Sequence, residues 1–276
     1  LVGAIAKILF GTKHIASVHG SDINIIKNSK ILIYIANFIC KHSDIIAVNS
    51  TFTKTLIENI LYEEHNRIEL IPMGVDKEKF FPFEDEIIKD KKGKKHILSV
   101  GNLIDWKGTK FLVQAMSIVI KKIKHISLDI IGDGPEKDNL IELIKKLGLD
   151  NYINMLGKIP NVKLPYYYNK SDVFIIPSIE VNGKTEGLGV VTLEAMACGT
   201  PPIGSKVGGI VDVIKHQYNG FLVEPESPEQ LAESIIKLLS DNSLIHKFSE
   251  NSIKLIDEKF SWEILSQRYK TLFNTI

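Results

Sequence analysis

Short apolar runs alternate with stretches of helical periodicity between residues 96 and 240, and this pattern constrains the fold most strongly. The strand-like runs are 96–100, 127–131, 152–156, 172–177, 202–205 and 220–223, and the helical stretches are 108–124, 135–147, 160–169, 189–198, 208–215 and 227–240. Strands that alternate with helices predict a parallel sheet with helices on both faces. They are apolar runs rather than alternating ones, as expected of strands covered on both sides.

A shorter series of the same kind precedes this one. Its expected strands are 14–18, 44–48 and 68–72, and its expected helices are 23–41 and 51–61. The segment 76–95 is rich in Lys, Asp, Glu and Pro, so we interpret it as a solvated linker. Residues 243–276 form a helical stretch after the second sheet is complete. A chain of 276 residues is long enough for two domains.

Composition excludes several classes of function. The net charge is +1, which does not favour non-specific binding to nucleic acid. Cys40 and Cys198 lie in apolar surroundings without metal or redox spacing, so we expect two buried thiols. The eight histidines lack the spacing of metal ligands. The longest apolar run, residues 31–40, is too short to span a bilayer.

Ligands of parallel α/β sheets bind beyond the carboxyl ends of the strands. The loops at those ends are 101–108, 132–135, 157–158, 178–189 and 206–209. Four of the five contain pairs of glycines, which allow backbone to approach a ligand closely. We therefore expect the functional site at this edge of the second sheet.

Residues 185–201 are the most informative of these segments. A glycine loop follows a strand and leads into an apolar helix that ends at Gly199 and Pro201. The free N–H groups and the positive end of such a helix suit a phosphate. Glu186 and Glu194 flank this helix start, but their spacing alone carries no signal, since it recurs elsewhere in the chain. A carboxylate inside an apolar helix is costly to bury unless it has a partner. For Glu194 the partner would be a ribose diol or a backbone group. Alternatively, the side chain would point outward into water.

Two further side chains stand at strand ends. Lys107 precedes a helix and is placed to reach a phosphate, with an ordinary surface lysine as the alternative. His19, beside Gly20, would bind a substrate or be satisfied by backbone groups. Gly132-Asp133-Gly134 lacks the third glycine of a dinucleotide fingerprint, and neither a Walker sequence nor a nucleophile elbow is present. A standard dehydrogenase and a P-loop enzyme are therefore disfavoured.

Taken in order, these motifs resemble the retaining glycosyltransferases of the GT-B fold, in the large group (family four, or group 1) with a Glu-x7-Glu signature. The stretches that carry the resemblance are 19–22, 48–50, 71–76, 99–103, 106–108, 131–135, 156–157, 172–178, 186–201, 208–209, 219–220 and 260–262. The resemblance implies an α/β protein with two facing Rossmann-like domains and parallel sheets. It also implies that the first domain is incomplete, because that domain normally begins with further strand–helix units. The chain starts at Leu1, so we expect an N-terminally truncated fragment that lacks most of the acceptor site.

The implied domains are residues 1–78 for the acceptor side and 79–245 for the nucleotide-sugar side, with 246–276 packing back on the first. The resemblance assigns the donor diphosphate to Lys107 and to the N–H groups of Gly187, Leu188, Gly189 and Val190. It places Glu194 at the ribose, Glu186 at the transferred sugar, and His19 opposite that sugar. Backbone at Gly157, Lys158 and Ile159 would face the base, and Gly132 and Gly134 would line the same pocket.

Two positions depart from the family pattern. Asn102 stands where many members carry Arg, so the diphosphate charge would rest more heavily on Lys107 and the helix N-terminus. Asp212 stands where Glu is usual after Gly208-Gly209, which is a milder change.

The implied activity is that of a retaining hexosyltransferase that takes a nucleoside diphosphate sugar as donor. No cofactor is expected, and the absence of an Asp-x-Asp pair predicts a metal-independent reaction. The implied acceptor is a lipid, a polysaccharide or a small molecule, as in cell-envelope polysaccharide synthesis. The implied location is the cytoplasm, with peripheral contact to the inner membrane face as an extension, since Lys7, Lys13, Lys27, Lys30 and Lys41 give the first domain a basic bias. A GT-B sugar-nucleotide epimerase and a non-catalytic nucleotide-sugar-binding protein remain as alternatives, and a nicotinamide-dependent oxidoreductase is remote.

Overall fold

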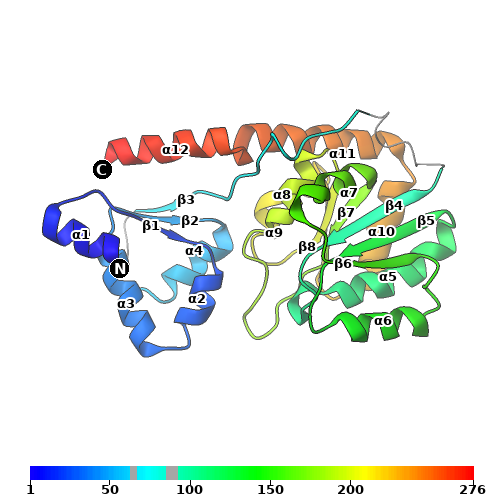
Figure 1. The fold of residues 1–276 in the computed structure, drawn as a ribbon, viewed down its shortest axis with the longest axis horizontal. Coiled ribbons are helices and arrows are strands. Elements are labelled where there is room, and N and C mark those ends of the chain that lie inside the picture. The colour runs from blue at the N-terminus through cyan, green and yellow to red at the C-terminus, as the bar shows by residue number, and fades with distance from the viewer. Residues whose placement is uncertain (63–66, 85–92) are drawn as a thin grey trace.

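The computed structural model describes residues 1–62, 67–84 and 93–276, which form two α/β units (Figure 1). The first unit has three parallel strands in the order β1-β2-β3 and the second has six in the order β6-β5-β4-β7-β8-β9. The strands are β1 Ile15–Val18, β2 Ile45–Val48, β3 Ile68–Leu70, β4 Lys95–Val100, β5 Ile126–Ile131, β6 Ile153–Gly157, β7 Val173–Ile176, β8 Pro202–Ser205 and β9 Phe221–Val223. The prediction of parallel sheets in an α/β fold is confirmed.

The second sheet is covered by helices on both faces, which explains why apolar residues predominate in its strands. One face packs against α5, α6 and α10, through residues such as Leu112, Ile144 and Ile235. The other face packs against α7, α8 and α9, with Tyr168 and Leu193 in its core. The helices are α1 Val2–Phe10, α2 Ser21–Ile26, α3 Lys30–Lys41, α4 Thr51–Glu58, α5 Thr109–Lys122, α6 Lys137–Lys146, α7 Leu164–Lys170, α8 Val190–Ala197, α9 Ile210–Val213, α10 Pro228–Leu239, α11 Asn242–Leu255 and α12 Trp262–Thr275.

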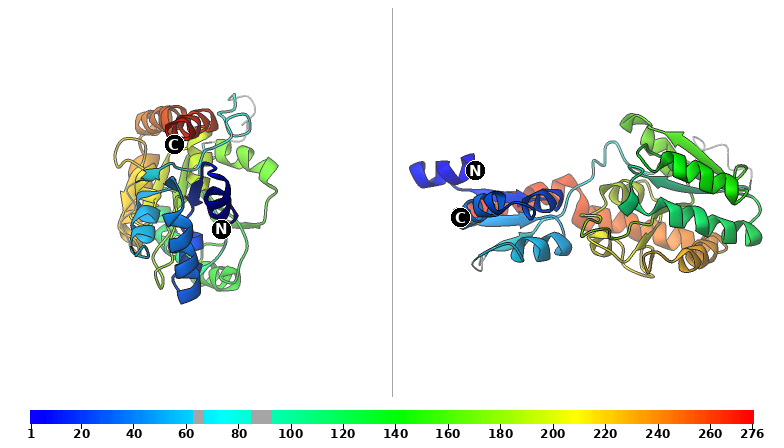
Figure 2. Two further views of the ribbon diagram at one scale, coloured as in Figure 1. Left: turned by 90° about the vertical axis from the view of Figure 1, so that its left-hand side faces the viewer. Right: turned by 90° about the horizontal axis from the view of Figure 1, so that it is seen from below.

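The last helix crosses back to the first unit. α12 runs along the small sheet, and Figure 2 shows it bridging the two units from a second direction. Leu265 is fully buried and packs with Ala47 and Ile71 on one face of that sheet. The opposite face holds a separate core from α2, α3 and α4. α11, by contrast, packs on the second unit through Phe248 and Leu255.

Two predicted helices are interrupted by serines. The stretch 23–41 is two helices, because the Ser29 hydroxyl accepts a hydrogen bond from the Leu32 N–H at 3.4 Å and starts α3 there. The stretch 243–276 is broken at Ser261, whose hydroxyl caps α12 by accepting from the Ile264 N–H at 3.3 Å. Residues Ile256–Phe260 between α11 and α12 form a π-helical turn. The helical period continues through both breaks, so hydrophobic spacing alone does not reveal them.

The prediction of a solvated linker over 76–95 is wrong at its beginning. Phe80 is buried in the core of the second unit, and its ring meets that of Tyr168 edge-on at 6.0 Å. The Phe83 N–H donates to Asn169 Oδ1 at 2.6 Å. The Phe80 ring thus anchors this segment to the core, although the charged composition of the segment suggests that it is exposed to solvent. Residues 85–92 of the predicted linker lie outside the described residues.

Across the described part of the chain, no helix combines the length and apolarity needed to cross a membrane.

Candidate functional site between the two units

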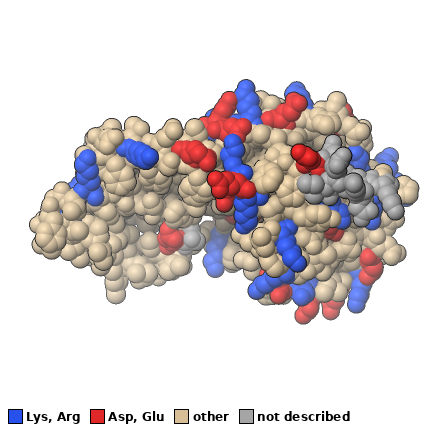
Figure 3. Space-filling view, turned by 45° about the horizontal axis from the view of Figure 1, so that its top comes forward, with Lys and Arg blue, Asp and Glu red and all other residues tan. Residues whose placement is uncertain are grey.

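A cavity of about 870 Å³ lies between the two units, where Figure 3 shows the surface hollowed. The first unit contributes His19, Gly20, Asn24, Ile25, Asn28, Asn49, Phe52 and Met73 to its lining. The second contributes Trp106, Lys107 and residues 184–191. These residues follow strand ends: His19 comes directly after β1, Asn49 after β2, and Trp106 and Lys107 belong to the loop after β4. The cavity therefore lies at the carboxyl edge of the strands, where ligands of parallel α/β sheets bind.

Lys107 and Glu186 form an ion pair at this cavity. The Lys107 ammonium donates a hydrogen bond to Glu186 Oε2, and the Ser178 hydroxyl donates to the same oxygen at 3.4 Å. The two side chains are only 21% and 14% exposed, so water screens their attraction less than that of a surface pair. Lys107 is therefore electrically compensated in this state, and an entering anion would compete with Glu186 for it.

The start of α8 presents backbone donors to the same cavity. Gly187, Leu188, Gly189 and Val190 all line it. Gly189 precedes the helix at φ 80, a left-handed conformation that favours glycine, and its cap makes no side-chain hydrogen bond. The first N–H groups of a helix have no partner within the helix, and α8 is capped by no side chain. An anion in this part of the cavity would meet those donors and the positive end of the helix dipole.

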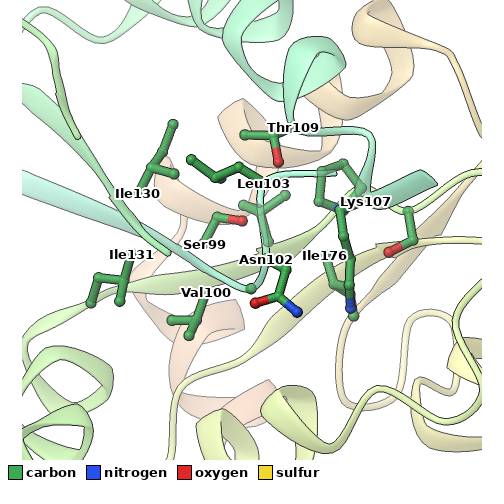
Figure 4. A pocket seen from close by; sticks show the side chains of 13 residues that line it. Ser99, Val100, Asn102, Leu103, Lys107, Thr109, Ile130, Ile131 and Ile176 are labelled. Carbon is green, nitrogen blue, oxygen red and sulfur yellow. The ribbon is translucent and has the colours of Figure 1, made fainter. Parts of the chain in front are cut away.

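A second, much smaller pocket of about 10 Å³ adjoins Lys107 (Figure 4). Asn102 lines it, and the polar ends of Asn102 and Lys107 lie on the same side of the pocket. Its volume corresponds to about one water molecule. Asn102 thus lies beside Lys107, but it adds no charge.

Three predicted glycines, Gly132, Gly134 and Gly157, follow or end neighbouring strands, and the first two are packed closely against backbone. A Cβ on Gly132 would lie 1.8 Å from the Gly101 carbonyl oxygen, and one on Gly134 would lie 2.3 Å from the Leu103 carbonyl oxygen. The Gly132 N–H donates to the Gly157 carbonyl at 2.9 Å. The two residues that follow Gly157 differ in exposure: Lys158 is exposed, and Ile159 packs on the core. These residues lie at the ends of β5 and β6, and they are not among the residues that line the large cavity.

Glu194 lies one turn further along α8 and away from the large cavity. Its Oε2 accepts a hydrogen bond of 2.8 Å from the hydroxyl of the buried Tyr168. Burial raises the pKa of Glu194, while this hydrogen bond and the charge of Lys79 act in the opposite direction. The partner of Glu194 in the structure is therefore the side chain of Tyr168. The alternatives considered from the sequence were a ribose diol, a backbone group and an outward orientation, so this partner was not predicted.

Asp212 connects the two units directly. Its carboxylate accepts from the Thr51 N–H at 2.6 Å and from the Thr51 hydroxyl at 2.8 Å, at the first turn of α4. The approach requires glycine nearby, because a Cβ on Gly209 would lie 2.1 Å from the Gly187 carbonyl oxygen and 2.8 Å from Ser50 Cβ. In the sequence, Asp212 is only a mild departure from the family pattern. Its position after two glycines was the available signal, but its partner is 161 residues away.

Replacing Asp212 by Ala should loosen the contact between the units. It removes the acceptor for the Thr51 N–H and hydroxyl and a favourable negative charge at the start of α4, worth about 1 kcal/mol of unfolding free energy. Small-angle scattering should give a larger radius of gyration than for the unchanged chain. Asp241→Ala is the matched control, because Asp241 accepts from the Leu244 N–H at 3.1 Å within a single unit. Equal scattering from the two variants would contradict this role of Asp212.

The cavity also contains a second lysine that the sequence analysis did not single out. The Lys184 ammonium lies 5.4 Å from the centre of the Trp106 ring, a cation–π distance. The turn that carries Lys184 is held from the first unit, since the Lys27 ammonium donates to the Gly183 carbonyl at 3.3 Å. Trp106, Lys184, Asn24 and Asn49 thus join the predicted residues at this site. Within the described ranges, no group of three or more His, Cys, Asp or Glu residues is placed to hold a metal ion.

Comparison with known proteins places this chain in a family. The family model described as glycosyl transferases group 1 matches residues 80–255. An uncharacterized glycosyltransferase of Methanocaldococcus jannaschii is 32% identical over 263 residues, which cover 95% of this chain and 68% of that protein. N-acetyl-alpha-D-glucosaminyl L-malate synthase of Bacillus anthracis is 29% identical over 276 residues, which cover 98% of this chain and 70% of the synthase.

The fold has solved counterparts. The Anabaena protein HepE, solved in complex with UDP, superposes with a TM-score of 0.86 at 22% identity, over 100% of this chain and 76% of that one. Likeness at this level of identity concerns the fold, and it confirms the prediction of a GT-B architecture.

Proposed function

Since the chain belongs to the glycosyl transferases of group 1, we propose that it moves a sugar from a nucleoside diphosphate sugar to an acceptor, with retention of configuration at the anomeric carbon. One observation carries the proposal furthest. A partly buried lysine–carboxylate pair and the uncapped start of α8 line the same cavity between the two units. That combination offers positive groups to a leaving phosphate and a carboxylate to the sugar attached to it.

Each of these residues would have a separate role in the transfer. As the bond between the anomeric carbon and the phosphate oxygen breaks, the electron pair stays on the phosphate. Lys107 and the N–H groups of residues 187–190 stabilise that charge. The acceptor hydroxyl attacks the anomeric carbon from the same face, and its proton passes to the leaving phosphate. Glu186 orients the sugar, and His19 faces it from the first unit.

We also propose how the donor is bound, which acceptors are used and where the reaction takes place. Glu194 binds the ribose of the donor, and backbone near residues 157–159 faces the base. The reaction uses no metal, because Lys107 and the start of α8 supply the positive groups. The acceptor is a lipid, a polysaccharide or a small molecule, and the reaction takes place in the cytoplasm, with the protein soluble or peripheral on the inner membrane face.

A binding experiment tests the donor site. Calorimetry with UDP-glucose, UDP-N-acetylglucosamine and GDP-mannose should identify at least one of them as a ligand. Glu194→Ala should then weaken binding of that donor about 10- to 100-fold, the effect of losing hydrogen bonds to a charged group. The unfolding midpoint of the variant should be measured alongside.

Glu142→Ala is the matched control, since Glu142 is an exposed glutamate of α6 away from the cavity. Its donor affinity should equal that of the unchanged chain. If Glu194→Ala bound the donor as tightly as Glu142→Ala does, Glu194 would have no place in the site. Release of free sugar or nucleoside diphosphate from the bound donor would separate an enzyme from a protein that only binds nucleotide-sugars.

A further inference from the structure

Tyr168 of α7 is held rigidly inside the second unit. Its side chain is fully buried, and its ring meets those of Phe80 at 6.0 Å and Phe174 at 5.8 Å, both edge-on. Its carbonyl oxygen accepts from the Thr200 hydroxyl at 2.7 Å, which ties α7 to the end of α8. A tyrosine fixed on all sides in this way has a hydroxyl whose position is set by the core.

That hydroxyl points at Glu194. It donates to Glu194 Oε2 at 2.8 Å, from one helix to the next. Phenylalanine would fill the same space in the core, so packing alone does not require the hydroxyl. An ionised carboxylate has about four acceptor positions, and one bond from Tyr168 leaves the others for a ligand. The hydroxyl therefore constrains the carboxylate without saturating it.

The hydrogen bond from Tyr168 affects how readily Glu194 ionises, together with burial and nearby charge. Burial disfavours the ionised carboxylate and raises its pKa, while Tyr168 on α7 and Lys79, ahead of β4, act against that effect. Cys198, on the same helix, is buried with its pKa raised to about 12, and the pKa of Tyr168 is raised well above its usual value by burial. Both groups are neutral near pH 7, so Tyr168 always offers a proton to the carboxylate. Among the described residues, loss of the hydroxyl would leave the charge of Lys79 to favour the ionised form.

We propose that Tyr168 is a positioning residue that orients Glu194 toward the 2′- and 3′-hydroxyl groups of the donor ribose and thereby sets the preference for a ribonucleotide. This inference rests on the proposed role of Glu194 in donor binding. A carboxylate that accepts two hydroxyl protons must be ionised and correctly rotated, and the hydrogen bond from Tyr168 serves both needs. Tyr168 itself is enclosed by the core and touches the ligand only through Glu194.

The first test needs no ligand. Tyr168→Phe removes one oxygen, and Tyr166→Phe makes the same change at an exposed tyrosine of the same helix. Carbon-13 NMR titration of the glutamate carboxyl groups, assigned with Glu194→Gln, follows Glu194 directly. Tyr168→Phe should move its titration to higher pH, and Tyr166→Phe should leave it in place. An unmoved titration in Tyr168→Phe would overturn the inference.

The second test uses UDP and GDP with their 2′-deoxy counterparts, in calorimetric titrations of the full chain. The comparison uses whichever base, uracil or guanine, binds more tightly. Tyr168→Phe should weaken binding of that ribonucleotide about 5- to 20-fold and binding of its 2′-deoxy counterpart less. The ratio of the two affinities, which measures the preference for ribose, should therefore fall. Its ribonucleotide affinity should also fall off at higher pH than in the unchanged chain, as pH is lowered through the titration of Glu194. Equal losses for both sugars would show a purely structural effect and overturn the inference.

The outcomes separate this inference from the proposal beneath it. If the unchanged chain prefers the ribonucleotide and Tyr168→Phe keeps that preference, only the role of Tyr168 fails. If the unchanged chain shows no preference, or binds none of the four nucleotides, the role of Glu194 at the ribose fails. The unfolding midpoints of both tyrosine variants check that the fold is retained, and Tyr168→Phe should remain folded because its ring packing is unchanged.

Discussion

Lys107→Gln should slow cleavage of the sugar–phosphate bond about 100- to 1,000-fold, the cost of removing one preorganised group from a developing oxyanion. The Lys107 side chain is partly buried and lines the same cavity as the start of α8. Water would therefore stabilise the charge on the leaving phosphate less well than the lysine does. The variant also leaves Glu186 without its cation, close to where the diphosphate would bind. Release of nucleoside diphosphate from the donor identified by calorimetry measures the effect.

Two variants sharpen this prediction. Lys206→Gln breaks an exposed ion pair with Glu224 and should leave the rate unchanged. Lys107→Gln combined with Glu186→Gln should recover part of the donor affinity, because the uncompensated carboxylate is gone, but not the rate. A rate in Lys107→Gln within threefold of that of Lys206→Gln would show that Lys107 pairs with Glu186 for structure alone.

Gly132→Ala should lower the free energy of unfolding by about 3 to 5 kcal/mol, through backbone strain and overpacking together. Gly132 has φ 147, a conformation that side chains rarely adopt. The added Cβ would lie 1.8 Å from the Gly101 carbonyl oxygen, and backbone at the end of β4 must move to admit it. Chemical denaturation followed by circular dichroism measures the change.

Gly157→Ala is the control for strain without a clash. Gly157 has φ 68 and lies at the next strand end, but a Cβ there has open space around it. Its cost should be about 1 kcal/mol, that of a left-handed residue. Equal losses for the two glycine variants would mean that the close contact with Gly101 does not limit the fold.

Much of the fold could be predicted because its signals are local. Runs such as 127–131 and 172–177 are predominantly apolar in the sequence, and the corresponding strands β5 and β7 lie between helix layers. Gly199 and Pro201 mark the end of α8 for the same reason, since a helix stop depends on adjacent residues. Boundaries that depend on one hydroxyl, such as Ser29 and Ser261, were missed.

The partners of the site residues could not be predicted, because they meet only in the folded chain. Lys107 and Glu186 are 79 residues apart, and Asp212 and Thr51 are 161 apart. Sequence reasoning left the partner of Glu194 open, since nothing near it in the chain identifies Tyr168. Phe80 was assigned to a linker on composition, and only its contact with the second core corrects that.

The return of α12 to the first sheet has a consequence for the order of folding. β1, β2 and β3 are synthesised before the second unit, yet one face of their sheet stays uncovered until α12 leaves the ribosome and Leu265 reaches Ala47 and Ile71. The Val75 N–H also donates to the Phe260 carbonyl at 2.8 Å, so both connections between the units run side by side. The first unit is therefore completed later than the second during translation.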